Sequence, residues 1–111
     1  MSGTQTVAFC VVFVTCPTKT AARKLAQRVL QVKAAACVNI LPSVSSHYWW
    51  QGKIERSSEV LLILKTRRDR YVLLEKTIRA GHPYQVPEIL ALPILSGSKP
   101  YLNWIDSSLI S

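Results

Sequence analysis

Residues 47–54 read His47-Tyr48-Trp49-Trp50-Gln51-Gly52-Lys53-Ile54, and this stretch decides the fold because it places a β-hairpin in the middle of the chain. Aromatic residues favour strands, and a glycine between two such runs is typical of a tight turn, which we expect at Gly52. The return strand is predicted to continue to Lys65, with a bulge at Ser57-Ser58. Such an arm is longer than a small sheet needs, and tryptophans on an extended arm suit packing across subunits.

Upstream of the hairpin, the pattern predicts a strand, a helix and a second strand. Residues 7–15 form a nearly unbroken apolar run rich in β-branched and aromatic residues, typical of a strand covered on both faces. A helix should then open after Pro17, with Thr18 or Thr20 as its cap. Its apolar stripe would consist of Ala22, Leu25, Ala26 and Val29. The second strand is predicted over residues 37–41, ended by Pro42.

Downstream, a second helix, a strand and a last helix are expected. Asp69 can cap the second helix, and Gly81 suits the position after its end. This helix would share a face formed by Tyr71, Leu74 and Ile78. A strand is predicted over residues 89–95, with Pro93 indicating a sheet edge. The last helix should start at Ser98-Lys99-Pro100 and turn inward Tyr101, Trp104, Ile105 and Leu109.

The element order β-α-β-β-α-β plus a terminal helix predicts an α+β, ferredoxin-like fold in one domain over residues 1–111. Right-handed crossovers would place both main helices on one face of the sheet, which leaves the other face uncovered. The chain is 49% hydrophobic, more than a small monomer can easily hide. We therefore expect a homotrimer assembled through the open face and the hairpin arm, although periodicity alone does not choose the number three.

Charge and cysteine usage limit the classes of function. The net charge of +8 is dispersed over several segments, so solvated helix faces are favoured over a nucleic-acid surface. Trp49 and Trp50 point to opposite faces of one strand, which favours interface packing over a base-stacking platform. Three cysteines without C-x-x-C spacing indicate free thiols in a reducing compartment. The apolar stretch near the N-terminus is too short to span a membrane, so a cytoplasmic protein is expected, and removal of a targeting segment stays open.

Residues 82–88, His82-Pro83-Tyr84-Gln85-Val86-Pro87-Glu88, are the segment in which we expect chemistry. The two prolines fix their own φ and push the preceding residues out of the helical region, so the backbone is stiff. An imidazole, a phenol and a carboxylate on such a segment keep their directions, as a binding site requires.

The chain resembles the CutA family of divalent-cation tolerance proteins over nearly its whole length. The matching blocks are residues 35–42, 48–54, 58–61, 65–66, 82–88, 91–94 and 100–104. The resemblance implies a ferredoxin-like subunit in a tight trimer whose sheets pack around the threefold axis. It also implies copper binding in some bacterial members and, for animal members, a role in the processing or membrane anchoring of acetylcholinesterase.

One departure from the family pattern concerns copper. Bacterial members with a described copper site use a cysteine at the end of the first strand and adjacent histidines before the proline. Aligned through Pro17, the matching position is Val14, with Cys16 two residues later. Only His82 precedes Pro83, so the animal-type pattern fits better.

Two kinds of site are expected. A metal site would use His82, Glu88 and Cys16, with copper or another divalent cation as the ion, although no cofactor is required. The alternative for His82 is a structural hydrogen bond to backbone at the helix end. A ligand cleft or trimer interface would include Trp49, Trp50, Lys65, Tyr84, Gln85, Tyr101 and Trp104. The alternative there is a structural ion pair such as Lys65–Glu88.

No catalytic arrangement is evident, so we do not expect an enzyme. The helix N-terminus could lower the pKa of Cys16, although a lone thiol at such a place is more often unreactive. The leading hypothesis is a non-enzymatic trimer that binds a divalent metal weakly. The second is a trimeric scaffold for a protein client without a metal role. The third is a small-ligand sensor similar to the PII signalling proteins, by fold analogy.

Overall fold

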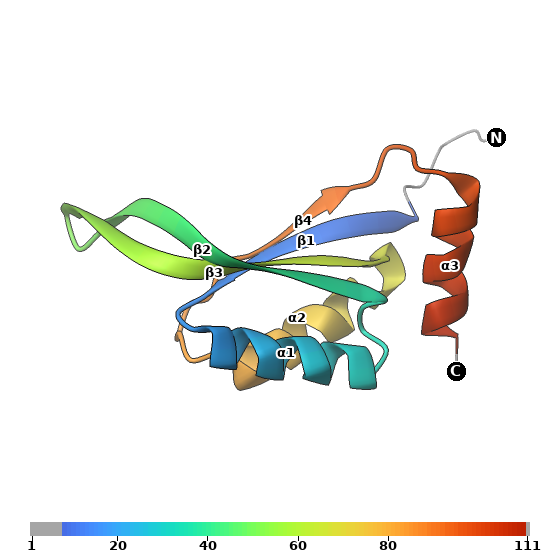
Figure 1. Ribbon diagram of the computed structural model, residues 1–111, viewed down its shortest axis with the longest axis horizontal. Helices are drawn as coiled ribbons and strands as arrows, with labels where there is room; N and C mark the ends of the chain where they lie inside the picture. The colour runs from blue at the N-terminus through green and yellow to red at the C-terminus, as the bar shows by residue number, and fades with distance from the viewer. Residues whose placement is uncertain (1–7, 111) are drawn as a thin grey trace.

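The computed structural model describes residues 8–110, which form one antiparallel four-stranded sheet and its helices. The chain order is β1 (Phe9–Cys16), α1 (Lys19–Gln31), β2 (Cys37–Trp50), β3 (Lys53–Arg67), α2 (Tyr71–Gly81), β4 (Ile89–Pro93) and α3 (Lys99–Leu109), with a short 3-10 turn at Arg68–Arg70 before α2. The strands lie in the order β2-β3-β1-β4, which is the ferredoxin-like order. Figure 1 shows α1 and α2 side by side beneath the sheet, as right-handed crossovers require.

The helix-covered face of the sheet carries the core. Every second residue of β1 is buried, and the cross-strand register places the buried side chains of β3 beside them. This core consists of Val12, Val14, Val60, Leu62 and Leu64 from the strands, Ala22, Leu25 and Val29 from α1, and Leu74 and Ile78 from α2. The predicted stripes of both helices are therefore confirmed.

The two ends of α1 follow from local chemistry. The Thr18 side chain caps the helix by accepting a hydrogen bond from the Ala21 N–H at 3.1 Å, which decides between the two predicted caps. At the other end, Lys33 has a φ of 60°, and the Ala34 N–H donates to the Val29 carbonyl at 2.9 Å. These bonds satisfy the last carbonyls and direct the chain into β2.

The hairpin arm is longer than predicted because β2 does not end at Pro42. The strand continues through a register shift between Leu41 and Val44, and the predicted bulge at Ser57-Ser58 is wrong, since those residues pair regularly with Ser46 and Ser45. A proline without an N–H is tolerated in an edge strand at a bulge, and β2 is an edge strand. The turn is confirmed: Gln51 and Gly52 both have positive φ, of 50° and 79°, as a type I′ turn requires.

Helix α2 differs from prediction at both ends. Asp69 does not cap it; its carboxylate binds the Arg67 guanidinium, and the cap position belongs to Arg70, whose side chain makes no capping bond. Gly81 is the last helical residue, not a left-handed residue beyond it. A Cβ at Gly81 would lie 3.3 Å from Leu25 Cδ2, so close approach to α1 explains the glycine. His82 has extended backbone before Pro83, which stops the helix as expected.

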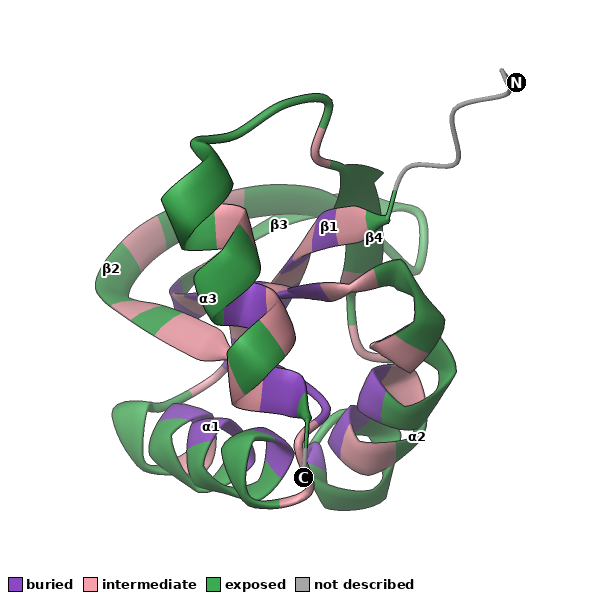
Figure 2. Cartoon of the chain, turned by 90° about the vertical axis from the view of Figure 1, so that its right-hand side faces the viewer, coloured by how far each residue is buried: buried purple, intermediate pink, exposed green. Residues whose placement is uncertain are grey.

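The last two elements lie at an edge and an end of the sheet. Strand β4 stops at Pro93, earlier than predicted, and its edge position agrees with that proline. Helix α3 is capped by the Ser98 hydroxyl and stands across one end of the sheet (Figures 1 and 2). Ile105 and Leu109 are buried as predicted, whereas Tyr101 and Trp104 are exposed. Only two of the four side chains predicted to face inward therefore do so.

The second face of the sheet is open in the described chain. The first strand was expected to be covered on both faces, but the alternate residues of β1 are only half-buried. Of its predicted residues, 7 and 8 precede β1, and residue 7 lies outside the described residues. Register places on this face Val11 and Phe13 of β1, Leu61 and Ile63 of β3, Leu90 and Leu92 of β4, and Leu41 of β2. Leu90 and Leu92 are 56% and 44% exposed. Large apolar side chains therefore face outward along this side.

Candidate functional site

The segment 82–88 folds back over the end of β1, and the His82 ring fixes it there. The imidazole is buried and uses both nitrogens: Nε2 lies 2.7 Å from the Thr15 carbonyl, and Nδ1 accepts the Tyr84 N–H at 3.0 Å. Because a carbonyl only accepts, this arrangement selects the tautomer that carries its proton on Nε2. His82 thus ties the helix end to β1, which is the structural role named above as the alternative to a metal ligand.

A buried carboxylate forms the second part of this cluster. Glu59 of β3 is 8% exposed, and its Oε2 accepts a hydrogen bond from the Tyr84 hydroxyl at 2.9 Å. The Tyr84 ring lies 4.9 Å from the His82 ring, centroid to centroid. Burial first, and then the bond to Glu59, raise the pKa of Tyr84 to about 12, so the phenol remains a donor at neutral pH.

Cys16 ends β1 beside the same cluster, and its thiol is fully buried. Burial, followed by the charge of Glu59, raises its pKa to about 11. The prediction that the helix N-terminus lowers the pKa of Cys16 is therefore wrong. The alternative, an unreactive thiol, describes this residue better.

The structure brings two of the three predicted metal ligands, His82 and Cys16, to this cluster. The third, Glu88, is exposed and comes just before β4; the carboxylate beside the phenol belongs to Glu59. Within residues 8–110, no three His, Cys, Asp or Glu side chains gather in an arrangement that could hold a metal ion. A metal at His82 would have to replace the bond to Thr15 or the bond from Tyr84.

Lys65 lies elsewhere, on the open face of the sheet. Its amine donates to the Asn39 side-chain oxygen and lies 4.0 Å from the Cys37 sulfur, both on β2. The ion pairs found within the described residues do not include Lys65–Glu88. On α3, partial burial and then the nearby Cys37 raise the pKa of Tyr101.

The remaining predicted residues lie in three separate places. Trp49 and Trp50 stand at the tip of the hairpin arm and are 72% and 60% exposed. Tyr101 and Trp104 stack on α3 with ring centroids 5.5 Å apart. Gln85 lines a cleft beside α2. One chain therefore does not gather these five residues, together with Lys65 and Tyr84, into a single cleft.

Glu59 is the residue that sequence reasoning missed. No motif in the sequence distinguishes it from the other three glutamates of the chain. The available signal was its place directly before the apolar run of β3, where a carboxylate enters the covered part of the sheet. Its partner Tyr84 is 25 residues away, so no local spacing pointed to the pair.

The fold and the cluster define a class: a ferredoxin-like α+β protein with a long hairpin arm, a third helix across the sheet end, and a histidine-tyrosine-carboxylate lock at the end of β1. The profile of one family, described as CutA1 divalent ion tolerance protein, matches residues 10–108. The chain belongs to this family.

Similar proteins carry the same family name. "Protein CutA 1, chloroplastic" of Oryza sativa is 46% identical over 107 residues, which are 96% of this chain and 60% of the relative. "Protein CutA" of Homo sapiens is 45% identical over 93 residues, 84% of this chain and 52% of the relative. The chain thus spans little more than half the length of these relatives. The crystal structure of CutA1 from Oryza sativa superposes with a TM-score of 0.89 at 47% identity, covering 93% of this chain and 94% of that one.

Proposed function

We propose that this chain is a non-enzymatic subunit of a homotrimer, and that the trimer acts as a rigid scaffold which presents surfaces to a protein client. The subunit would assemble through the open face of the sheet and the hairpin arm. Its membership of the divalent ion tolerance family is compatible with this role and with the metal role considered below.

The observation that carries this proposal is the unequal covering of the sheet. The helix-covered face is closed by α1 and α2, whereas the other face leaves Leu90 more than half exposed. The arm adds Trp49, Trp50 and Ile54, of which Ile54 is 68% exposed. Exposed apolar side chains in this number favour an interaction surface, and copies of the same chain arranged around an axis would remove them from water.

Assembly is tested with a pair of matched variants and light scattering. Leu90→Asp places a charge on the open face, whereas Leu30→Asp places the same charge on the outer side of α1, where Leu30 is 43% exposed. We expect trimer mass for the unmodified chain and for Leu30→Asp, and a shift toward monomer for Leu90→Asp. Equal masses for both variants would remove the open face from the account.

A divalent-metal role is the second candidate, and what favours it is the neighbourhood of His82, Cys16 and Glu59 near the end of β1, where Glu59 is bonded to Tyr84 and His82 to Thr15. In the described chain these side chains do not yet form a three-ligand metal site. Thiolate, carboxylate and imidazole are ligand types that copper accepts. Because both His82 nitrogens are already bonded, we expect such binding to be weak and to require local rearrangement.

Calorimetric titration of Cu(II) in a weakly coordinating buffer tests the metal role. His82→Ala removes the buried ring, and His47→Ala removes the exposed histidine of the arm as a control. Stoichiometric binding that is lost only in His82→Ala would support the metal role. Absent binding, or binding unchanged in His82→Ala, would count against the metal role and favour the scaffold over it.

For the compartment, we propose the cytoplasm or another reducing space, because all three cysteines are free thiols and two of them are buried. In the described residues, no helix is long and apolar enough to cross a membrane.

A further inference from the structure

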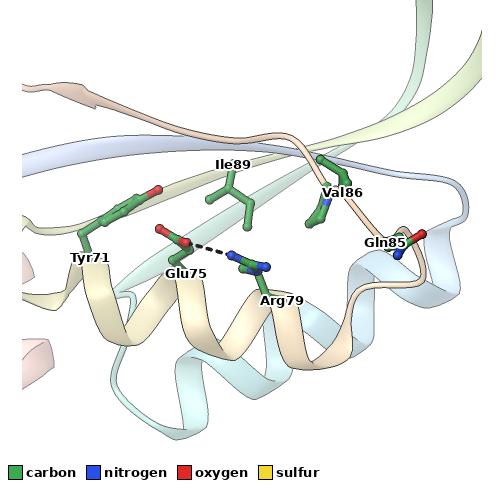
Figure 3. A pocket seen from close by; sticks show the side chains of 7 residues that line it. Tyr71, Glu75, Arg79, Gln85, Val86 and Ile89 are labelled. Atoms are coloured by element: carbon green, nitrogen blue, oxygen red, sulfur yellow. Dashed lines mark ion pairs between the residues drawn. The ribbon is translucent and has the colours of Figure 1, made fainter. Parts of the chain in front are cut away.

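A small cleft separates α2 from the segment that leads into β4 (Figure 3). Its volume is about 200 Å³, and it is lined by Tyr71, Glu75, Arg79, Gln85, Val86, Pro87 and Ile89. Neither His82 nor Glu59 lines it, so it is distinct from the cluster at the end of β1. The edge strand β4 leaves this side of the sheet unpaired within the chain.

One wall of the cleft is a row of polar side chains on α2. Tyr71, Glu75 and Arg79 follow at intervals of four residues, so they stand on one helix face, as Figure 3 shows. Burial, and then the neighbouring Glu75 carboxylate, raise the pKa of Tyr71. The Arg79–Glu75 ion pair is long, at 3.5 Å, with side chains 63% and 39% exposed. Such a pair holds its members weakly, and both can accept a further partner.

The other wall is stiff and mostly apolar. Pro87 fixes the backbone beside Val86, and Ile89 begins the β4 pairing with Val14. Gln85 adds one side-chain amide at the end of the cleft, beyond Arg79 (Figure 3). The cleft therefore combines one cation, one carboxylate, two neutral hydrogen-bonding groups and an apolar surface.

We propose that this cleft binds a small apolar α-amino acid in its zwitterionic form. The Arg79 guanidinium and the Gln85 amide bind the carboxylate, Glu75 and the Tyr71 hydroxyl bind the ammonium group, and the apolar side chain packs on Val86 and Ile89. This site goes beyond the proposed scaffold and does not require it.

Charge and size select this ligand class. A simple anion would lie against Glu75, and a simple cation would lie against Arg79, so each would meet one unfavourable charge. A molecule with both charges satisfies both. The cleft, at about 200 Å³, is smaller than a typical site for a drug-sized ligand, so it suits a compound of amino-acid size rather than a nucleotide.

NMR titration of the intact protein with L-leucine tests the proposal. Two further probes each lack one charge: N-acetyl-L-leucine has no ammonium group, and L-leucinamide has no carboxylate. The variants are Arg79→Ala and, as a control, Arg23→Ala, which removes an exposed cation from α1. Light scattering on each variant reports the assembly separately, so failure of this site and failure of the scaffold are distinguishable.

We expect saturable shifts with L-leucine around Gln85–Ile89, a loss of tenfold or more in affinity for both single-charge probes, and a similar loss in Arg79→Ala but not in Arg23→Ala. No shifts at tens of millimolar L-leucine would overturn the proposal. Equal binding of the three probes, or unchanged affinity in Arg79→Ala, would overturn it as well.

Discussion

The two faces of the sheet are formed by the same strands, but one face is buried and the other is exposed. On the helix-covered face, Val12, Leu62 and Leu64 are fully buried by elements of the same chain. On the open face, Leu90 and Leu92 remain about half exposed. The hairpin arm continues past the helices (Figure 1), and its Trp49 and Trp50 are 72% and 60% exposed. The difference teaches that the chain completes one core by itself and leaves a second apolar layer exposed, which the proposed assembly would cover.

The largest effect should come from the helix-covered face. Leu64→Ala leaves a cavity in the closed core and should lower the free energy of unfolding by about 2–5 kcal/mol, at every protein concentration. Leu92→Ala removes the same atoms from the open face, so its loss should depend on protein concentration. Urea unfolding at several concentrations measures both. If the two losses show the same concentration dependence, the faces do not differ as described.

A smaller loss of stability is expected at the histidine-tyrosine-carboxylate lock at the end of β1. Tyr84→Phe leaves the buried Glu59 carboxylate without the donor seen at 2.9 Å, which should lower the free energy of unfolding by roughly 1–3 kcal/mol. Tyr48→Phe on the exposed arm removes a 3.2 Å bond to Ser57 and serves as the control. We expect little change there; equal losses in both would show that Glu59 does not need this partner.

Alkaline pH should act on the closed region through Cys16. Its pKa rises from 9.0 in the unfolded chain to about 11 in the fold, so between these values the unfolded state binds fewer protons. The contribution of Cys16 to stability is thus constant well below pH 9 and falls as the pH passes through that value, by at most about 1.4 kcal/mol per pH unit. Thermal unfolding from pH 8 to 10.5 measures this fall, and Cys16→Val should make it shallower, with buried Cys10 accounting for part of the remainder. An unchanged slope in that variant would assign the fall to other groups.

The smallest effect belongs to the predicted helix cap. Asp69 binds Arg67 in a pair with side chains 60% and 31% exposed and does not cap α2. Asp69→Ala should therefore lower the free energy of unfolding by less than about 1 kcal/mol, and high salt should reduce the difference. Thr18→Ala is the matched control, because Thr18 does cap a helix, and its loss of stability should be larger. The reverse order would mean that Asp69 stabilises the helix start.

The sequence was sufficient for features that depend on neighbouring residues. The stripes of α1 and α2, the Gly52 turn, the start of α3 at Ser98 and a threonine cap on α1 all arise from local chemistry, although the structure was needed to choose Thr18 over Thr20. The alternate burial of β1 was not predicted, because the open second face is a property of the whole sheet. Pro42 was misinterpreted as a strand end because its tolerance depends on β2 being an edge strand, which is a property of the whole sheet.

The candidate site was predictable only in part, for a similar reason. The stiff segment at 82–88 was found from its prolines, and the structural role of His82 was foreseen as an alternative. Its partner carbonyl at Thr15 is 67 residues away, and the Glu59–Tyr84 bond joins another strand, so neither followed from spacing. The outward position of Trp104 also depends on how α3 stands at the sheet end, which helical periodicity does not determine.

Sedimentation equilibrium of the unmodified chain over a range of micromolar concentrations tests the central claim most directly. If the open face and the arm are completed by copies of the chain, the mass should be three times 12.4 kDa across that range. A mass of 12.4 kDa would contradict the account, because the exposed apolar layer would then remain in water.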